Sequence, residues 1–235
     1  MNEYTTSFGN SAADALPADR AQFIRKTYML VAAAILAFVA LETMIFVSGA
    51  HEMILNVLFM GGNMSWLIVL GAFMGISFLA NRWAMSDTST TTQFLGLGVY
   101  IVAEAIIFVP MIYMAAVYSD ATVIPKAGIV TLGLFLGITA TVFITKADFS
   151  WLGPIVAIGG FAALGFIVAS IIFGFSLGSI FAFIMVAFAG TAILYNTSNV
   201  LHTFNTKQHV AAALTLFAGI ALLFWYILSI FSSRD

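Results

Sequence analysis

Long apolar segments recur along the whole chain, separated by short connections that hold most of its charged residues. The first segment, TYMLVAAAILAFVALETMIFVS at 27–48, is as long as the helix of about 20 residues that crosses a hydrocarbon core about 30 Å thick. Six similar segments follow, at about 64–81, 94–117, 125–145, 152–173, 178–200 and 210–231. The pattern predicts an all-α polytopic membrane protein with seven transmembrane helices, in contact with the lipid bilayer over most of its length.

Two stretches outside the seven segments have a different character. Residues 1–19 are polar, rich in small side chains and free of Lys and Arg, which is typical of disorder and unlike a secretory signal peptide. We therefore expect a disordered cytoplasmic tail at 1–19 and a seven-helix membrane domain at 20–235. The stretch EMILNVLFMGGN at 52–63 is either a short helix at the membrane surface or a plain loop.

The composition excludes several classes of protein. With 62% hydrophobic and 8% charged residues and a mean hydropathy of +1.08, the chain lies far from soluble domains, which are about 45–50% apolar and about 25% charged. A net charge of −2 without a basic cluster argues against nucleic acid as a partner. The chain has no Cys and three His, and it carries none of the motifs of phosphate-binding, zinc or serine-nucleophile sites. We expect no cofactor, no metal site and no catalytic residue, and therefore no enzyme.

The positions of Lys and Arg predict which way the chain crosses the membrane, because short cytoplasmic connections are enriched in these residues. With the N-terminus in the cytoplasm, six of the eight fall on the cytoplasmic side: Arg20, Arg25, Lys26, Arg82, Lys146 and Lys207. Lys126 and Arg234 fall outside. The sequence thus predicts a cytoplasmic N-terminus and an external C-terminus, and a cytoplasmic reporter fused after Asp235 would contradict it.

Two glutamates fall inside apolar segments. Glu42 lies about two-thirds along the first, and Glu104 lies near the middle of the third, six residues before Pro110. A charge inside the bilayer costs about 2.5–3.5 kcal/mol on insertion scales, so each glutamate is a candidate for function. Each is either a proton acceptor or cation ligand on an ion path, or a neutral, hydrogen-bonded structural residue. The structural interpretation is favoured for both, more strongly for Glu42, because Thr43 follows it and the group lies closer to the membrane surface.

A polar run, YNTSN at 195–199, ends the sixth segment, and His202 lies just beyond it. Such residues at a helix end more often form a cap and a turn than a site. The alternative is a polar vestibule on the cytoplasmic side, lined by Thr197, Ser198, Asn199 and His202.

Glycines recur four residues apart in two segments, as Gly71 with Gly75 and as Gly133 with Gly137. This spacing is typical of helices that pack closely in membranes, but glycine is also simply tolerated in membrane helices. Both interpretations stay open on the sequence alone.

Two segments in the second half of the chain resemble a known family. TKADFSWLG at 145–153 resembles the signature between helices four and five of the Bax inhibitor-1 family, and AILYNTSNVLH at 192–202 resembles a segment of that family's helix six. The end of the chain, LTLFAGIALLFWYILSIFSSRD, is similar to the family's final helix, most closely in its bacterial YccA branch. IRKTYML at 24–30 also fits the start of helix one in that branch.

The resemblance implies a bundle in which the final helix runs through the centre of the other six. Members of the family are described as pH-sensitive calcium-leak proteins and, in eukaryotes, as regulators of cell death. Members of the YccA branch are described as substrates and modulators of the membrane AAA protease FtsH. For this chain the resemblance therefore implies a protein of the bacterial inner membrane whose partner is such a protease, or whose permeant ion is Ca²⁺ or H⁺.

The chain departs from the family at the positions that are proposed to sense pH. Those members carry one aspartate in helix six and another in the last helix, which share a proton and hold a pore closed. The corresponding residues here are Asn196 and Gly219, neither of which ionises. A di-aspartyl switch is thus absent, and the two residues mark a residual gate position. We expect a modulator of a membrane AAA protease; the alternative is a calcium or cation leak channel with Glu104 near its path.

Overall fold

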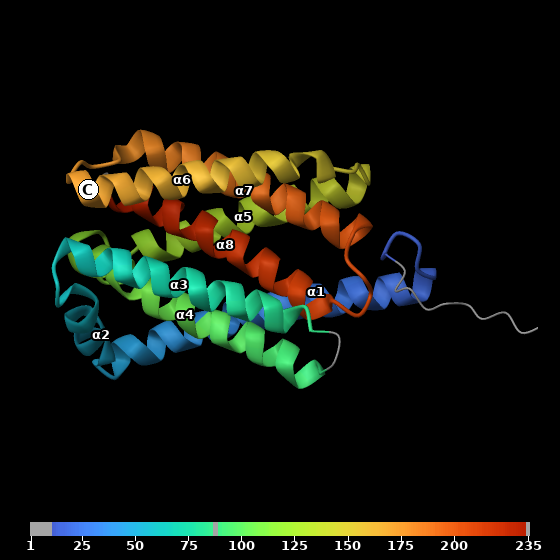
Figure 1. Ribbon diagram of the computed structural model, residues 1–235, viewed down its shortest axis with the longest axis horizontal. Coiled ribbons are helices and arrows are strands. Elements are labelled where there is room, and N and C mark those ends of the chain that lie inside the picture. The colour runs from blue at the N-terminus through green and yellow to red at the C-terminus, as the bar shows by residue number, and fades with distance from the viewer. Residues whose placement is uncertain (1–10, 87–88, 234–235) are drawn as a thin grey trace, which may run out of the picture.

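The computed structural model of the protein describes residues 11–86 and 89–233, which form one bundle of helices (Figure 1). Within that part of the chain, seven helices are long and apolar enough to cross a membrane. They are α1 (Pro17–Val47), α3 (Asn63–Ala84), α4 (Thr90–Tyr118), α5 (Val123–Thr145), α6 (Gly153–Phe173), α7 (Gly178–His202) and α8 (His209–Ser232). Each of the seven apolar segments lies on one of these helices, so the predicted all-α polytopic membrane fold is confirmed.

The start of α1 differs from the expected tail. The helix begins at Pro17, ten residues before the first apolar segment, because proline suits the first turn, where its missing N–H is not needed. Just before it, Ala12 is fully buried and its N–H donates to the Phe204 carbonyl oxygen at 2.8 Å. The predicted disorder is therefore not found in residues 11–19, and the rest of the predicted tail, residues 1–10, lies outside the described part of the chain.

The stretch after α1 forms a short helix, α2 (Ala50–Phe59), which lies across the far ends of α1 and α3 (Figure 1). Its 10 residues are too few to cross a bilayer. Of the two alternatives for this stretch, the helix is the correct one. A further single turn of 3₁₀ helix, η1 (Ser150–Leu152), precedes α6.

The last helix, α8, lies at the centre of the bundle, between the layer formed by α1, α3 and α4 and the layer formed by α5, α6 and α7 (Figure 1). It packs against α1, α3, α4, α5 and α7. In the most apolar 18-residue stretch of α8, 61% of the residues are buried, compared with 6% in α3. The helix α8 therefore forms the core of the bundle, and α3 lies at its periphery. The central last helix that the resemblance implies is confirmed.

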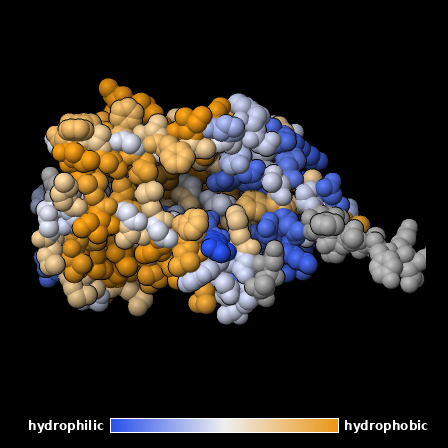
Figure 2. Space-filling view, in the orientation of Figure 1, coloured by the Kyte–Doolittle hydropathy of each residue, from blue (hydrophilic) through white to orange (hydrophobic). Residues whose placement is uncertain are grey.

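Six of the Lys and Arg residues lie at one end of the bundle, which we name the cationic end: Arg20, Arg25, Lys26, Arg82, Lys146 and Lys207. In Figure 2 this end, on the right, is mostly hydrophilic, and a broad apolar belt covers most of the rest of the face shown. The belt is what the hydrocarbon core of a membrane requires, so the protein is an integral membrane protein in contact with lipid.

The paired glycines do not pack helices together within the chain. A Cβ atom built on any of the four would meet nothing within 4 Å: Gly71, Gly75, Gly133 and Gly137. The close contact is made instead by Gly96 of α4, whose added Cβ would lie 2.5 Å from the Ala80 carbonyl oxygen of α3. Of the two interpretations left open by the sequence, close packing within the chain therefore does not hold for these pairs, which lie exposed on the apolar surface.

Candidate functional site

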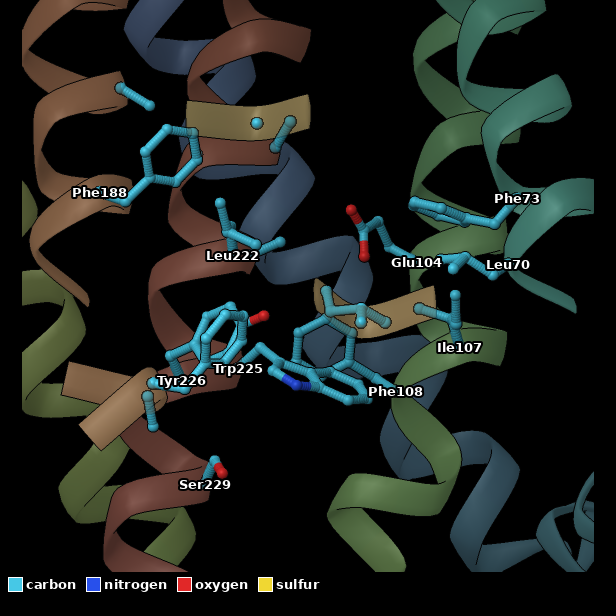
Figure 3. Close-up of a pocket in the computed structure, with 18 of the residues that line it drawn as sticks. Leu70, Phe73, Glu104, Ile107, Phe108, Phe188, Leu222, Trp225, Tyr226 and Ser229 are labelled. Atoms are coloured by element: carbon cyan, nitrogen blue, oxygen red, sulfur yellow. The ribbon is translucent and has the colours of Figure 1, made fainter. Parts of the chain in front are cut away.

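A cavity of about 820 Å³ runs along α8, between α3 and α4 on one side and α6 and α7 on the other. Figure 3 shows part of its wall, and Figure 2 shows the same face of the molecule hollowed near its middle. Most of the wall is apolar. Its polar side chains come from four helices and include Asn81, Tyr100, Glu104, Asn196, Thr215 and Ser229. We call this space the Glu104 cavity.

Glu104 is the ionisable acid of this cavity. It is 6% exposed, lies at the middle of α4, and its carboxyl group points across the cavity toward α8 (Figure 3). The hydroxyl of Tyr100, one helical turn earlier, is its hydrogen-bond partner. Six residues later Pro110 lies inside the helix, where it removes one backbone hydrogen bond. Glu104 is thus placed as its sequence position suggested, inside the membrane and beside a weakened stretch of helix.

Asn196 and Gly219 border the same cavity and form a contact between α7 and α8. The Asn196 amide Nδ2 donates to the Thr215 carbonyl oxygen at 3.2 Å. One turn along α8, a Cβ added to Gly219 would lie 2.9 Å from the Ile193 Cγ1 atom of α7. An amide-to-backbone hydrogen bond and close packing therefore join the two helices at the positions where the resembling proteins carry aspartates.

Glu42 lies on the opposite side of α8, in a second cavity of about 470 Å³ between α1, α4, α5 and α8. It is 6% exposed, so it is buried inside the bundle. Neither carboxyl oxygen has a hydrogen-bond partner among the described residues. The neighbouring hydroxyl of Thr43 donates to the Val39 carbonyl oxygen at 2.7 Å instead. We call this space the Glu42 cavity; the structure thus separates the two glutamates.

Aromatic side chains stand between the two cavities, and we name them the aromatic wall: Phe38, Tyr100, Phe108 and Phe217. The ring centroids of Phe38 and Phe108 are 5.1 Å apart, and those of Tyr100 and Phe217 are 6.2 Å apart. These residues do not stand out in the sequence. With 23 Phe in the chain, nothing singles out three of them, although Phe108 falls one helical turn after Glu104 and so had to share its face.

The four candidate vestibule residues do not line either cavity. Ser198 accepts a hydrogen bond from the Phe149 N–H at 2.8 Å, and the Nδ1 atom of His202 lies 3.0 Å from the Ser198 carbonyl oxygen. Asn199 is bonded to the turn that follows, through the Thr203 hydroxyl at 3.3 Å. Thr197 is fully buried. The run therefore ends α7 and holds the α5–α6 connection, which is the commoner role weighed for it.

The two signature segments meet at the cationic end. Besides the bond from Phe149, a Cβ added to Gly153 would lie 3.2 Å from the Tyr195 hydroxyl oxygen, so glycine allows η1 to approach α7 closely. Next to it, Asp148 accepts a bond from the Ser150 N–H at 2.8 Å, which holds the pKa of the Asp148 carboxyl below its usual value. The ionised form is thus favoured by folding, and this contribution is lost as the pH falls through the lowered pKa.

Replacing Ser198 with alanine is expected to destabilise the protein by about 1 kcal/mol, because the Phe149 N–H loses its acceptor. Thermal unfolding in detergent measures the change. Ser170→Ala is the matched control, since the Ser170 hydroxyl bonds only the Ile167 carbonyl of its own helix. Equal unfolding temperatures for the two variants would contradict an anchoring role for Ser198.

The fold and the cavities define a polytopic helical membrane protein in which a central helix separates two buried carboxyl groups. Over residues 20–235 the chain matches the family described as inhibitor of apoptosis-promoting Bax1. It belongs to this family, the Bax inhibitor-1 family, as the two signature segments had indicated.

Two proteins have sequences similar to that of this chain. An uncharacterized protein of Pseudomonas aeruginosa is 28% identical over 172 residues, which are 70% of this chain and 72% of the relative. Bax inhibitor 1 of Schizosaccharomyces pombe is 28% identical over 172 residues, which are 70% of this chain and 61% of the relative. No solved structure matches the chain.

Proposed function

We propose that this protein is a non-catalytic, non-conducting regulator in a bacterial inner membrane, with its cationic end in the cytoplasm, and that it modulates a membrane AAA protease of the FtsH type. The observation that carries the proposal is the contact between α7 and α8. Coupled titration needs two acids that share a proton, whereas Asn196 bonds the α8 backbone and Gly219 packs against Ile193. A contact built this way holds the helices together at any pH, which suits a fixed partner surface better than a gate.

The protease is expected to engage the chain before Ser11. From Ser11 onward the chain is held at the cationic end, since Ser11 pairs with Asn205 and the Arg20 Nη2 atom donates to the Leu201 carbonyl oxygen at 3.2 Å. We therefore expect the handle within residues 1–10, a shorter segment than the tail expected from sequence.

Deleting residues 2–10 tests this proposal without disturbing the contacts of Ser11. The full chain, reconstituted with a membrane AAA protease and a membrane substrate, is expected to slow substrate degradation, and the deletion is expected to abolish the effect. A variant with residues 2–10 scrambled separates sequence from length. Unchanged substrate turnover on adding the full chain would overturn the proposal.

The second candidate function is a cation leak, and one observation favours it. The Glu104 cavity extends along α8 with polar side chains near both ends, from Asn196 and Thr215 to Ser229, and its carboxyl group lies between them. Such an arrangement suits a path for H⁺ or Ca²⁺ more than a solid core does.

Flux measurements in proteoliposomes decide between the two functions. For wild-type protein, we expect Ca²⁺ and H⁺ flux at the level of empty liposomes, because the α7–α8 contact holds the two helices together at any pH. Flux above that level would support the leak channel instead. In that case Glu104→Gln should change its pH profile, and an identical profile would remove Glu104 from the path.

A further inference from the structure

The Glu42 cavity contains an acid that nothing in the described protein satisfies. Both carboxyl oxygens of Glu42 are buried without a hydrogen-bond partner, although a buried polar group without a partner costs about 1–3 kcal/mol in proteins. Glu42 is the only ionisable side chain among the described residues that line this cavity. The carboxyl group is therefore placed to receive a donor from outside the chain.

The hydroxyl groups in the cavity wall are already committed to the backbone. Thr43 donates to the Val39 carbonyl oxygen at 2.7 Å, and Thr131 of α5 donates to the Ala127 carbonyl oxygen at 2.7 Å. A single proton on each hydroxyl makes one strong bond. The partner that Glu42 lacks is thus not supplied by its polar neighbours.

The cavity opens sideways, between α1 and α5. These helices meet near the cationic end, where the ring of Tyr28 lies 5.6 Å from that of Phe143. Glu42 follows Tyr28 by 14 residues along α1, which is about 21 Å of helix. At this level the lining residues Val39 and Leu132 are 53% and 41% exposed. Since both face the apolar belt, a ligand would enter from the hydrocarbon core of the bilayer.

We propose that the Glu42 cavity binds a lipid-soluble primary amine, with the ammonium group on the Glu42 carboxylate and the hydrocarbon body against the apolar wall. Rings of Phe46 and Phe224 also line the cavity, and aromatic faces attract cations. An ammonium group supplies both the charge and the hydrogen bonds that the carboxylate lacks. The proposal does not depend on the proposed function.

Other ligands fit the same observations less well. A bare Ca²⁺ ion takes 6–8 oxygen ligands, whereas this wall offers one carboxyl group. An anionic lipid would be repelled by the carboxylate. A long-chain alcohol matches the apolar wall, but it donates only one hydrogen bond and carries no positive charge to pair with the carboxylate. The comparison of an amine with an alcohol of equal length is therefore the decisive one.

The test uses the full chain in lipid nanodiscs with dodecylamine as the probe. Dicyclohexylcarbodiimide, an apolar reagent, activates carboxyl groups and couples them to a neighbouring amine as an amide, releasing the urea. We expect mass spectrometry of peptides to find the dodecylamide at Glu42. An excess of dodecyltrimethylammonium, which carries the positive charge but cannot couple, should suppress it about tenfold, and dodecanol should not.

Two results of the coupling would overturn the proposal. One is modification of the exposed control Glu52 without modification of Glu42, which would mean that the cavity does not admit the ligand. The other is equal suppression by dodecanol, which would mean that the cavity holds any alkyl chain without recognising charge.

A second measurement uses stability. Dodecylamine is expected to raise the thermal unfolding temperature of wild type and of Glu104→Gln, because a ligand that binds only the folded state stabilises it. It is expected to leave the unfolding temperature of Glu42→Gln unchanged. A rise retained in Glu42→Gln would contradict the assignment to Glu42. If this variant does not fold, the coupling experiment on wild type still decides.

Discussion

Replacing Gly96 with alanine is expected to destabilise the protein by about 1–3 kcal/mol, as overpacking of a tight contact does, and replacing it with leucine is expected to prevent folding. A Cβ atom at this position would lie 2.5 Å from the Ala80 carbonyl oxygen and 2.9 Å from the Ala84 nitrogen. Both are backbone atoms of α3, so no side chain can rotate away. The two helices would have to separate along their whole contact. Chemical denaturation in detergent micelles measures the loss.

The control for this prediction lies two residues further along α4. A Cβ added to Gly98 would meet nothing within 4 Å, and the residue is exposed. Gly98→Ala is therefore expected to leave stability unchanged or to raise it slightly, since alanine favours helix more than glycine does. If Gly98→Ala and Gly96→Ala lost the same stability, the close contact between α3 and α4 would not be the cause.

Truncating Phe108 to alanine is expected to have the second large effect, a loss of about 3–5 kcal/mol. The side chain is 2% exposed, and its ring lies 5.1 Å from that of Phe38 and 5.0 Å from that of Trp225. No neighbour is placed to fill the space, because cavities lie on both sides of the aromatic wall. The same denaturation experiment measures the loss.

Phe161→Ala is the matched control for Phe108→Ala, because Phe161 is 76% exposed on the outer face of α6. It removes the same atoms from a side chain that faces the bilayer. We expect the control to unfold like wild type. If both variants lost a similar free energy of unfolding, the packing of Phe108 in the aromatic wall would not be the cause of the loss.

Hydropathy predicted the fold well because lipid imposes a length and a complete set of backbone hydrogen bonds on every spanning helix. Hydropathy did not predict the structure of segments that lie outside the lipid. The first turns of α1, from Pro17 to Arg25, are polar and lie beyond the apolar belt. Their helix is stabilised by contacts with the end of α7, such as the bond from Arg20 to Leu201. Pairings between distant segments of this kind leave no periodic pattern.

The candidate site could be predicted in part. Glu42 and Glu104 stood out because charges are rare in apolar segments, but their separation into two cavities depends on which faces of α8 they meet. The glycine pairs show the same limit. Spacing places Gly71 and Gly75 on one face of a helix, and it does not say whether that face meets a helix or lipid. The role of Ser198 likewise depended on a partner 49 residues away.

The central helix α8 is a wall of both cavities, and Ala221 lines each of them. A shift of this helix toward α1 and α5 enlarges one space as it narrows the other. Occupants of the two cavities are therefore expected to compete although they never touch, and the competition must be reciprocal: the factor by which one ligand weakens the second equals the factor by which the second weakens the first. The single helix α8 would thus couple two sites on opposite sides of the bundle.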